Sequence, residues 1–344
     1  MKVLIDINHP AHVHYFRNFS RIMIENGHDV IFVSRDKEMA HRLLNLYGIP
    51  FIDRGKGKDG KIGKFMYLLY ADLKLLQLSR ELKPDLYLNF LHPYPSQVAR
   101  LLGKVSLVFS DTEHASLHHK LTVPFATKVY TPNCYRLDLG SKQVRFNGFM
   151  ELAYLHPNYF TPNPAILGLL GVKENERYVI IRFVSWAAAH DFGHTGMALE
   201  NKIKAVQRIS SHARVFITSE GELPQELEQY RINIPFNQMH DAIYYSSLLF
   251  GESATMASEA AVLGTPSIFI DNDGRGYTDE EERKYGIVFN FTESREDQKR
   301  AIDKAEEILM DSAGFARFKK VREDLINECV DTTQFMVDEV LTYA

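Results

Sequence analysis

Three histidines lie within residues 8–14, NHPAHVH, directly after the apolar run 2–7. The pKa of an imidazole lies near neutrality, so this side chain can transfer a proton, contact a phosphate or a sugar, or ligate a metal. A metal site is the least favoured of these, because no accompanying set of cysteines or histidines has a convincing ligand spacing. A structural role, in which His9 or His12 supports the loop, stays open. We predict that His12, with His9 beside it, is an acid/base or oxyanion-contacting group.

Polar residues also follow two further predicted strands. Asp111 and Glu113 come directly after strand 105–110. We take both as candidates for acid/base work, although Asp111 can equally cap a turn. The stretch RFVSWAAAHD, residues 182–191, offers a guanidinium for phosphate, a hydroxyl, an aromatic face for a sugar or base, and an acid/base imidazole. The residues concerned are Arg182, Ser185, Trp186 and His190. Core packing is the ordinary alternative for the tryptophan, and a buried ion pair for the arginine.

Residues 247–271, SLLFGESATMASEAAVLGTPSIFID, predict a buried strand, a polar turn and a short helix. The start of a helix carries free backbone N–H groups and the positive end of the dipole, which together favour a phosphate. We therefore predict diphosphate binding there, and Glu259 lies one turn further on, within reach of a ribose hydroxyl pair. The expected diphosphate contacts are Ser253, Ala254 and Thr255. Arg275 and Tyr277, after the next strand, are candidate diphosphate or sugar contacts. The ordinary alternative is a capped helix and a solvated carboxylate.

The elements that must position these residues alternate between strand and helix. Apolar runs recur at residues 2–7, 29–34, 85–90 and 105–110, and again at 178–184, 213–218, 248–251 and 266–270. Helical spacing separates them, which predicts parallel sheets covered on both faces. Three prolines within residues 157–164 favour a linker. We therefore predict two doubly wound domains, 1–155 and 156–344, with the ligand at the strand ends and in the cleft between the domains. A charged helical tail, 295–343, ends in a helix that can pack back on the first domain.

Composition excludes several classes of protein. The chain has 344 residues, a formal net charge of −4 and two cysteines far apart, Cys134 and Cys329. General nucleic-acid binders are usually basic, so we expect no nucleic-acid partner. A disulfide framework and a cysteine-rich zinc site are both disfavoured. The first residues read as a strand rather than a signal peptide, and no run is long enough for a membrane span. We expect a reducing, cytoplasmic setting.

The run SEAAVLGTP, residues 258–266, resembles the donor-binding signature of GT-B fold enzymes. These include nucleotide-sugar glycosyltransferases and non-hydrolysing UDP-N-acetylglucosamine 2-epimerases. The resemblance implies that Glu259 binds the ribose, and that Ser253 with nearby amides binds the diphosphate. The preceding GESA, residues 251–254, departs from the serine and glycines common in those families. The epimerases also carry a strand–H-x-E-A turn with an acid/base glutamate, and Glu113 is the position it would match.

Three further stretches resemble a bacterial and archaeal family of the GT-B superfamily known as domain of unknown function 354. They are DINHPAHVHYFRN at 6–18, GFMELAYLHP at 148–157 and RFVSWAAAHD at 182–191. The resemblance spans essentially the whole chain. It implies the GT-B fold, with two tandem Rossmann-like domains and an interdomain cleft, and it implies no settled reaction.

Three functions are consistent with these residues. The first is a metal-independent, cofactor-free glycosyltransferase that uses a nucleoside diphosphate sugar such as a UDP-sugar and a glycan or lipid-linked acceptor. Its pathway would be the synthesis of a surface polysaccharide or glycoconjugate. The second is a 2-epimerase-like enzyme that uses Asp111, Glu113 and His190. The third is a non-catalytic nucleotide-sugar-binding protein. Residues 54–70 combine a lysine-rich loop with FMYLLY, which favours peripheral contact with the inner face of a membrane, although an ordinary core face fits as well.

Overall fold

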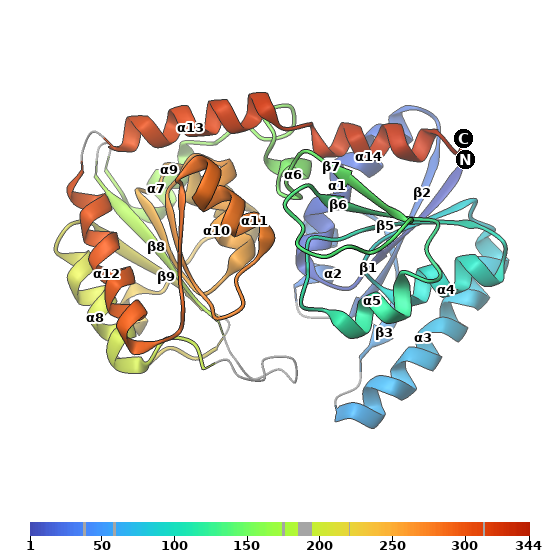
Figure 1. Ribbon diagram of the computed structural model, residues 1–344, viewed down its shortest axis with the longest axis horizontal. Helices are drawn as coiled ribbons and strands as arrows, with labels where there is room; N and C mark the ends of the chain where they lie inside the picture. Colours follow the sequence, from blue (N-terminus) through green and yellow to red (C-terminus); the bar gives the residue numbers. More distant parts are fainter. Residues whose placement is uncertain (37–38, 58–59, 174–175, 185–194, 220, 312–313) are drawn as a thin grey trace. The chain divides into compact units, whose positions relative to one another are not determined.

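The chain forms two compact units, each built on its own parallel sheet. The computed structural model describes residues 1–36, 39–57, 60–173, 176–184, 195–219, 221–311 and 314–344. Unit 1 comprises Met1–Tyr159 with Cys329–Ala344, and unit 2 comprises Phe160–Glu328 (Figure 1). The predicted boundary between residues 155 and 156 lies just before this division. Residues 329–344, predicted as part of the second domain, are counted with unit 1.

Unit 1 contains a seven-stranded parallel sheet within the described residues, in the order β3-β2-β1-β4-β5-β6-β7. The strands are β1 (Lys2–Ile7), β2 (Asp29–Asp36), β3 (Phe51–Lys56), β4 (Leu86–Phe90), β5 (Val105–Phe109), β6 (Lys128–Pro132) and β7 (Gln143–Phe146). The central strands β1 and β4 are almost wholly buried. Their near-continuous apolar runs are what a parallel sheet covered on both faces requires. The sequence reading missed β6 and β7, which are short and partly polar.

The helices of unit 1 form two groups that cover opposite faces of this sheet (Figure 1). The first group is α1 (Pro10–Glu25) with the three helices that contact it, α2 (Ala40–Leu46), α6 (Leu152–Leu155) and α14 (Thr332–Leu341). The second group is α3 (Gly60–Leu82), α4 (Pro93–Leu101) and α5 (Ser116–Thr122). Helix α14 is held by side-chain hydroxyls, because Thr332 and Thr333 donate to the carbonyl oxygens of Phe149 and Ala153.

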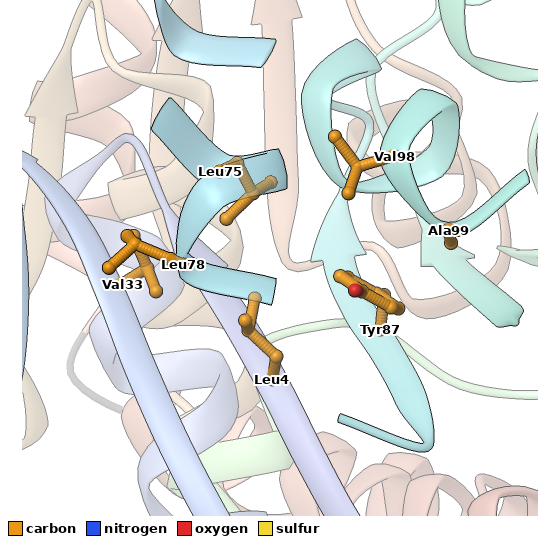
Figure 2. Packing of buried hydrophobic residues seen from close by; sticks show 7 residues of the cluster. All are labelled: Leu4, Val33, Leu75, Leu78, Tyr87, Val98 and Ala99. Atoms are coloured by element: carbon orange, nitrogen blue, oxygen red, sulfur yellow. The ribbon is translucent and has the colours of Figure 1, made fainter. Parts of the chain in front are cut away.

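A buried apolar cluster fixes α3 and α4 on the sheet (Figure 2). Its members are Leu4 of β1, Val33 of β2, Leu75 and Leu78 of α3, Tyr87 of β4, and Val98 and Ala99 of α4. Burying a large apolar side chain stabilises a fold by about 1.5–3 kcal/mol. The cluster therefore fixes the positions of β1, β4 and α4 relative to one another. The same packing positions the loops that follow the carboxyl ends of β1 and β4.

Unit 2 contains a five-stranded parallel sheet among the described residues, in the order β12-β11-β10-β8-β9. The strands are β8 (Tyr178–Phe183), β9 (Arg214–Ser219), β10 (Leu248–Gly251), β11 (Ser267–Ile270) and β12 (Val288–Phe291). Helices α8 (Leu199–Ser210) and α12 (Arg295–Met310) contact each other on one face, whereas α10 (Ala254–Val262) contacts α9 (Met239–Tyr245), α11 (Gly276–Glu280) and α13 (Gly314–Glu328) on the other (Figure 1). The remaining elements are α7 (Ala165–Leu170), η1 (Glu228–Tyr230), η2 (Phe236–Gln238) and the π-helical turn η3 (Glu281–Tyr285).

The charged helical tail predicted at residues 295–343 consists of three helices, α12, α13 and α14. It breaks after Met310 and again after Glu328, where Asp331 caps α14 by accepting the N–H of Gln334. Helices α12 and α13 belong to unit 2, and α14 belongs to unit 1. No helix in the part of the chain that the structure describes is both long and apolar enough to cross a bilayer.

Candidate functional site

The opening histidines lie where β1 ends and α1 begins. His9 is the residue before α1, and its extended backbone, with φ −146°, suits a residue that precedes proline. The N–H of Ala11 donates to Nδ1 of His9 at 3.2 Å, and the N–H of Asn8 donates to Nδ1 of His12 at 3.5 Å. A neutral imidazole whose Nδ1 accepts a hydrogen bond carries its proton on Nε2. Neutral His9 and His12 therefore present Nε2–H donors, which suits an oxyanion contact better than proton abstraction.

Two further histidines continue the line that His9 and His12 begin. The ring centroids lie 5.8 Å apart from His9 to His12, 5.2 Å from His12 to His92 and 5.8 Å from His92 to His118. We call these four side chains the imidazole row. His9 and His118 are exposed, His92 is half-buried, and His12 is 5% exposed. The sequence reading missed His92 and His118, although a second His-Pro pair at residues 92–93, again directly after a strand, was a usable signal.

A buried ion pair supports the loop that carries the row. The side chains of Asp6 and Arg54 are both fully buried, with Nη2 and Oδ1 3.0 Å apart. Asn8 donates to Asp6 and accepts from Nη2 of Arg54 at 2.7 Å. The guanidinium also lies over the ring of Tyr94, 4.7 Å from its centroid. Removing either charge would leave the other buried without its partner, which is strongly destabilising. This group therefore fixes residue 8, and with it the start of α1.

The electrostatics of the row follow from burial and like charges. Burial lowers the pKa of His92 well below its usual value, and His12, His118, Arg54 and His9 lower it further. His92 is therefore neutral at neutral pH. Its Nδ1 is a buried atom with no hydrogen-bond partner among the described residues.

Asp111 and Glu113 follow β5, at the same edge of the sheet. Asp111 is buried and accepts from the hydroxyl of Thr112 at 2.9 Å. Glu113 is half-buried, and its Oε1 accepts the N–H of Arg136 at 3.3 Å. Both carboxylates thus accept hydrogen bonds from unit 1, and both follow β5, the strand next to β4.

In unit 2 the strand–turn–helix at β10 and α10 has the predicted form. Gly251 has φ 155°, and a Cβ there would lie 2.1 Å from the carbonyl oxygen of Arg182, so the tight turn requires glycine. Ser253 caps α10 by accepting the N–H of Met256 at 3.4 Å. The capping expected as the ordinary alternative is therefore present, and the hydroxyl hydrogen of Ser253 is still a donor. Ala254 and Thr255 form the first turn of α10 and are half-buried.

Glu259 is not a solvated charge, as the ordinary alternative held. Its side chain lies on α10 and is 7% exposed as a residue, and Oε1 lies 2.9 Å from Nε2 of His240, which is 5% exposed. The sequence reading missed His240. A buried carboxylate with a hydrogen-bonded imidazole is held in one orientation, which is what recognition of a hydroxyl pair needs.

The remaining predicted contacts differ in their surroundings. Arg182 is half-buried beside Gly251 and donates to the hydroxyl of Thr218 at 3.1 Å. Arg275 donates to the carbonyl oxygen of Gly274 at 2.6 Å, and Tyr277 is buried rather than presented to solvent. Ser185, Trp186 and His190 lie outside the described residues.

Two buried glutamates were missed by the sequence reading. Glu252 accepts the backbone N–H groups of Val184 and Met197, so it ties β10 to the residues on both sides of 185–194. Glu281, the first residue of η3, is fully buried. The hydroxyl of Ser258 donates to it at 2.5 Å, and burial raises its pKa to about 8.

Residues 1–344 match the family described as "Protein of unknown function (DUF354)". The chain belongs to this family. It is also 26% identical over 281 residues to the "Uncharacterized protein MJ0665" of Methanocaldococcus jannaschii, covering 78% of this chain and 81% of that protein.

Solved structures similar to this DUF354 protein are GT-B glycosyltransferases and UDP-GlcNAc 2-epimerases. The UDP-GlcNAc 2-epimerase of Neisseria meningitidis bound to UDP-GlcNAc has a TM-score of 0.69 at 11% identity, covering 99% of this chain and 100% of that one. The spinosyn rhamnosyltransferase SpnG complexed with thymidine diphosphate has a TM-score of 0.64 at 13% identity, covering 98% and 100%. At such identities the likeness shows the fold alone, and that fold is GT-B.

A cavity in unit 2 of the DUF354 protein lies away from these residues. Its volume is about 490 Å³, and Leu170, Arg214 and Arg231 are among its lining residues. Arg214 begins β9, so this cavity lies at the amino end of that strand, opposite the edge where ligands of doubly wound folds bind. Over the described residues, no group of three or more histidine, cysteine, aspartate or glutamate side chains is arranged to hold a metal ion.

Proposed function

We propose that this DUF354 protein is a glycosyltransferase that transfers a sugar from a nucleoside diphosphate donor to an acceptor. The observation that carries the proposal is the turn from β10 into α10, with Gly251 packed on β8 and Glu259 fixed by His240. This turn offers helix-start amides for a diphosphate and a charged acceptor for a ribose within the same element. A UDP-sugar is the donor that we test first.

The nucleotide site belongs to unit 2 in this proposal. The backbone amides at the start of α10 and the hydroxyl of Ser253 bind the diphosphate, and Glu259 accepts hydrogen bonds from the ribose. Arg182 is near the same strand end, because its register partner in the sheet is Gly251. No cofactor or metal has a role, since helix dipoles and side chains suffice to hold a diphosphate.

Unit 1 supplies the acceptor side and the proton chemistry. His12 donates from Nε2 to an oxygen that becomes negative in the transition state, with His9 next to it in the row. Asp111 or Glu113 is the base for an acceptor hydroxyl, since each is a carboxylate at the carboxyl end of β5.

The acceptor is a glycan or lipid-linked compound in the synthesis of a surface polysaccharide or glycoconjugate, reached from the cytoplasmic face of a membrane. Helix α3 supports this partner, because four exposed apolar side chains lie at helical spacing on one of its faces. They are Met66, Leu69, Tyr70 and Leu73, with exposed fractions of 52%, 44%, 49% and 68%. Lys56, in the preceding segment, is 83% exposed. Lysines beside an apolar helix face suit an anionic membrane surface.

A 2-epimerase is the second candidate, favoured by the Asp-Thr-Glu turn of residues 111–113. Such an enzyme needs carboxylates but no acceptor. Incubating the protein with the bound nucleotide sugar alone separates the two functions, because only an epimerase yields an epimeric nucleotide sugar. A nucleotide-sugar-binding protein without activity would bind the same ligand and yield no product.

The first experiment is a thermal-shift panel of nucleoside diphosphates and their sugars. A ligand that binds the folded state raises the unfolding temperature as its concentration exceeds the dissociation constant. We expect stabilisation by one base and its sugar conjugates, and a smaller shift for the Glu259→Ala protein. Stabilisation by no member of the panel would overturn the proposal.

A further inference from the structure

Two helices of unit 1 begin side by side with the same sequence signature. Strands β1 and β4 are neighbours in register, with Asp6 opposite Asn89, and each is followed by a His-Pro pair that opens a helix. His9 precedes α1, which has 16 residues, and His92 precedes α4, which has nine. Since each helix start is the positive end of a dipole, this edge of the sheet attracts an anion from two directions.

The backbone before His92 is held in an uncommon conformation. Leu91 has φ 47°, in the left-handed region that a residue with a branched side chain rarely adopts. The side-chain oxygen of Asn89 accepts the N–H of His92 at 2.9 Å and so stabilises this turn. The ring of His92 stacks on that of Tyr94, at an interplanar angle of 13°. The imidazole is therefore positioned by its surroundings rather than free to rotate.

A ring nitrogen of His92 that is unpartnered among the described residues points to a ligand. The Nδ1 atom of His92 is buried, and the described residues give it no hydrogen-bond partner. A buried ring nitrogen without a partner loses the free energy of a hydrogen bond, unless a ligand supplies it. His118 lies 5.8 Å away and is exposed, so the pair reaches from the protein surface inward to His12. The proposed glycosyl transfer uses neither His92 nor His118.

We propose that His92 and His118, with the start of α4, form an oxyanion site in unit 1 that binds a phosphate monoester carried by the acceptor. The identity of the ligand as the acceptor rests on the proposed function, whereas the anion site itself does not. A tetrahedral oxyanion matches this turn because imidazole N–H groups are donors and the start of α4 is the positive end of a helix dipole. Since Pro93 and Pro95 carry no N–H group, Tyr94 supplies the backbone N–H among the first three residues of α4. It would also account for the orphaned nitrogen of His92.

Binding of a dianion should be linked to proton uptake. Without an anion, His92 binds a proton only weakly. Burial lowers its pKa, and the neighbouring His12, His118, Arg54 and His9 lower it further. Asp6 is already paired with Arg54, and Tyr94 is the other titratable side chain that stacks on His92. An anion at His92 opposes these effects and favours the imidazolium form.

The test is calorimetry of the full-length protein with three probes: sulfate, inorganic phosphate and glycerol phosphate. Sulfate keeps its charge between pH 6 and 8, so its titration in two buffers of different ionisation enthalpy reports protons taken up by the protein alone. We expect proton uptake and tighter sulfate binding at the lower pH. We expect glycerol phosphate to bind at least as tightly as inorganic phosphate, whereas the reverse order would mean that free phosphate is the ligand and would overturn the acceptor assignment.

Two variants and one control locate the site. His92→Gln and His118→Asn should each weaken sulfate binding about tenfold or more, as for a lost hydrogen bond to a charged group. His212→Asn, an imidazole of unit 2 near Glu306, should bind sulfate like the wild type. Because His118 is exposed, its variant tests the site even if the His92 variant does not fold.

Saturating nucleotide separates this site from the one proposed in unit 2. Sulfate should bind the nucleotide-loaded protein with undiminished affinity, and it should bind even if no nucleotide is ever found to bind. Loss of sulfate binding on nucleotide addition would place the anion in the nucleotide site and overturn the inference. Unchanged affinity in the His118→Asn protein would do the same.

Discussion

The imidazole of His240 and the carboxylate of Glu259 lie 2.9 Å apart, between Nε2 and Oε1, on the neighbouring helices α9 and α10. Both side chains are buried, and their contact gives each a polar partner. The pair therefore holds the Glu259 carboxylate in one orientation, between one and two helical turns beyond the Ser253 cap. The proposed ribose contact is thus made by a side chain that is already in place before nucleotide binds.

Glu259→Ala should weaken nucleotide binding by about 1–3 kcal/mol, as for a lost hydrogen bond to a charged group. Calorimetry with the best ligand of the thermal-shift panel measures this change. Glu259→Gln keeps an oxygen for His240 and loses only the negative charge, so it separates ribose binding from damage to α10. If neither substitution changes the affinity for any nucleotide that the wild type binds, the ribose assignment is wrong.

The membrane prediction concerns the exposed face of α3. Replacing Leu69 and Leu73 by glutamate should reduce co-sedimentation with vesicles that contain anionic phospholipid, because the pair removes apolar area and adds like charge. Leu199→Glu, at an equally exposed leucine of unit 2, is the matched control and should leave sedimentation unchanged. Equal binding of wild type and double variant, or no binding by the wild type, would remove the membrane surface from the proposed function.

The sequence predicts the positions of strands and helices better than it predicts which side chains surround the polar residues. Long apolar runs such as β1 and β4 are recognisable because a strand buried on both faces needs them. Strands β6, β7 and β12 lie toward the sheet edges, are short and carry polar residues, so periodicity does not reveal them.

The sequence alone predicts only some residues of the candidate site, because the others come from distant parts of the chain. Local motifs place Ser253 and Glu259 correctly on one turn and helix, because strand, turn and helix are contiguous. Partners such as His92 and His240 come from other elements, and only the tertiary structure brings them to His12 and Glu259. The burial of charged side chains is likewise a property of packing that no local pattern carries.

Glu281 gives a prediction about pH and stability. Burial raises its pKa from the ordinary 4.5 to about 8, so between these values the folded protein binds a proton that the unfolded chain has lost. Stability contributed by this group is therefore fully present below pH 4.5 and is lost as the pH rises toward 8. Glu281→Gln cannot ionise, so the free energy of unfolding of the variant relative to wild type should increase across this window and level off above it. Urea unfolding at several pH values measures the difference, and Glu282→Gln is the control for a lost formal charge. If the free energy of unfolding of Glu281→Gln runs parallel to that of wild type across the pH range, the assignment is wrong.

The last prediction concerns the role of His12 itself. Because Nδ1 of His12 accepts the N–H of Asn8, only Nε2 is directed to a reacting oxygen. Asparagine can replace the Nδ1 acceptor but has no atom at the Nε2 position, whereas the longer glutamine places an amide N–H near it. His12→Asn should therefore lower turnover by a factor of roughly 10² or more, as for a lost acid/base or oxyanion group, and His12→Gln should lose less. Release of nucleoside diphosphate measures turnover, and nucleotide affinity with urea unfolding controls for damage elsewhere. Full turnover in His12→Asn, or unfolding of both variants, would return this histidine to a role in supporting the loop.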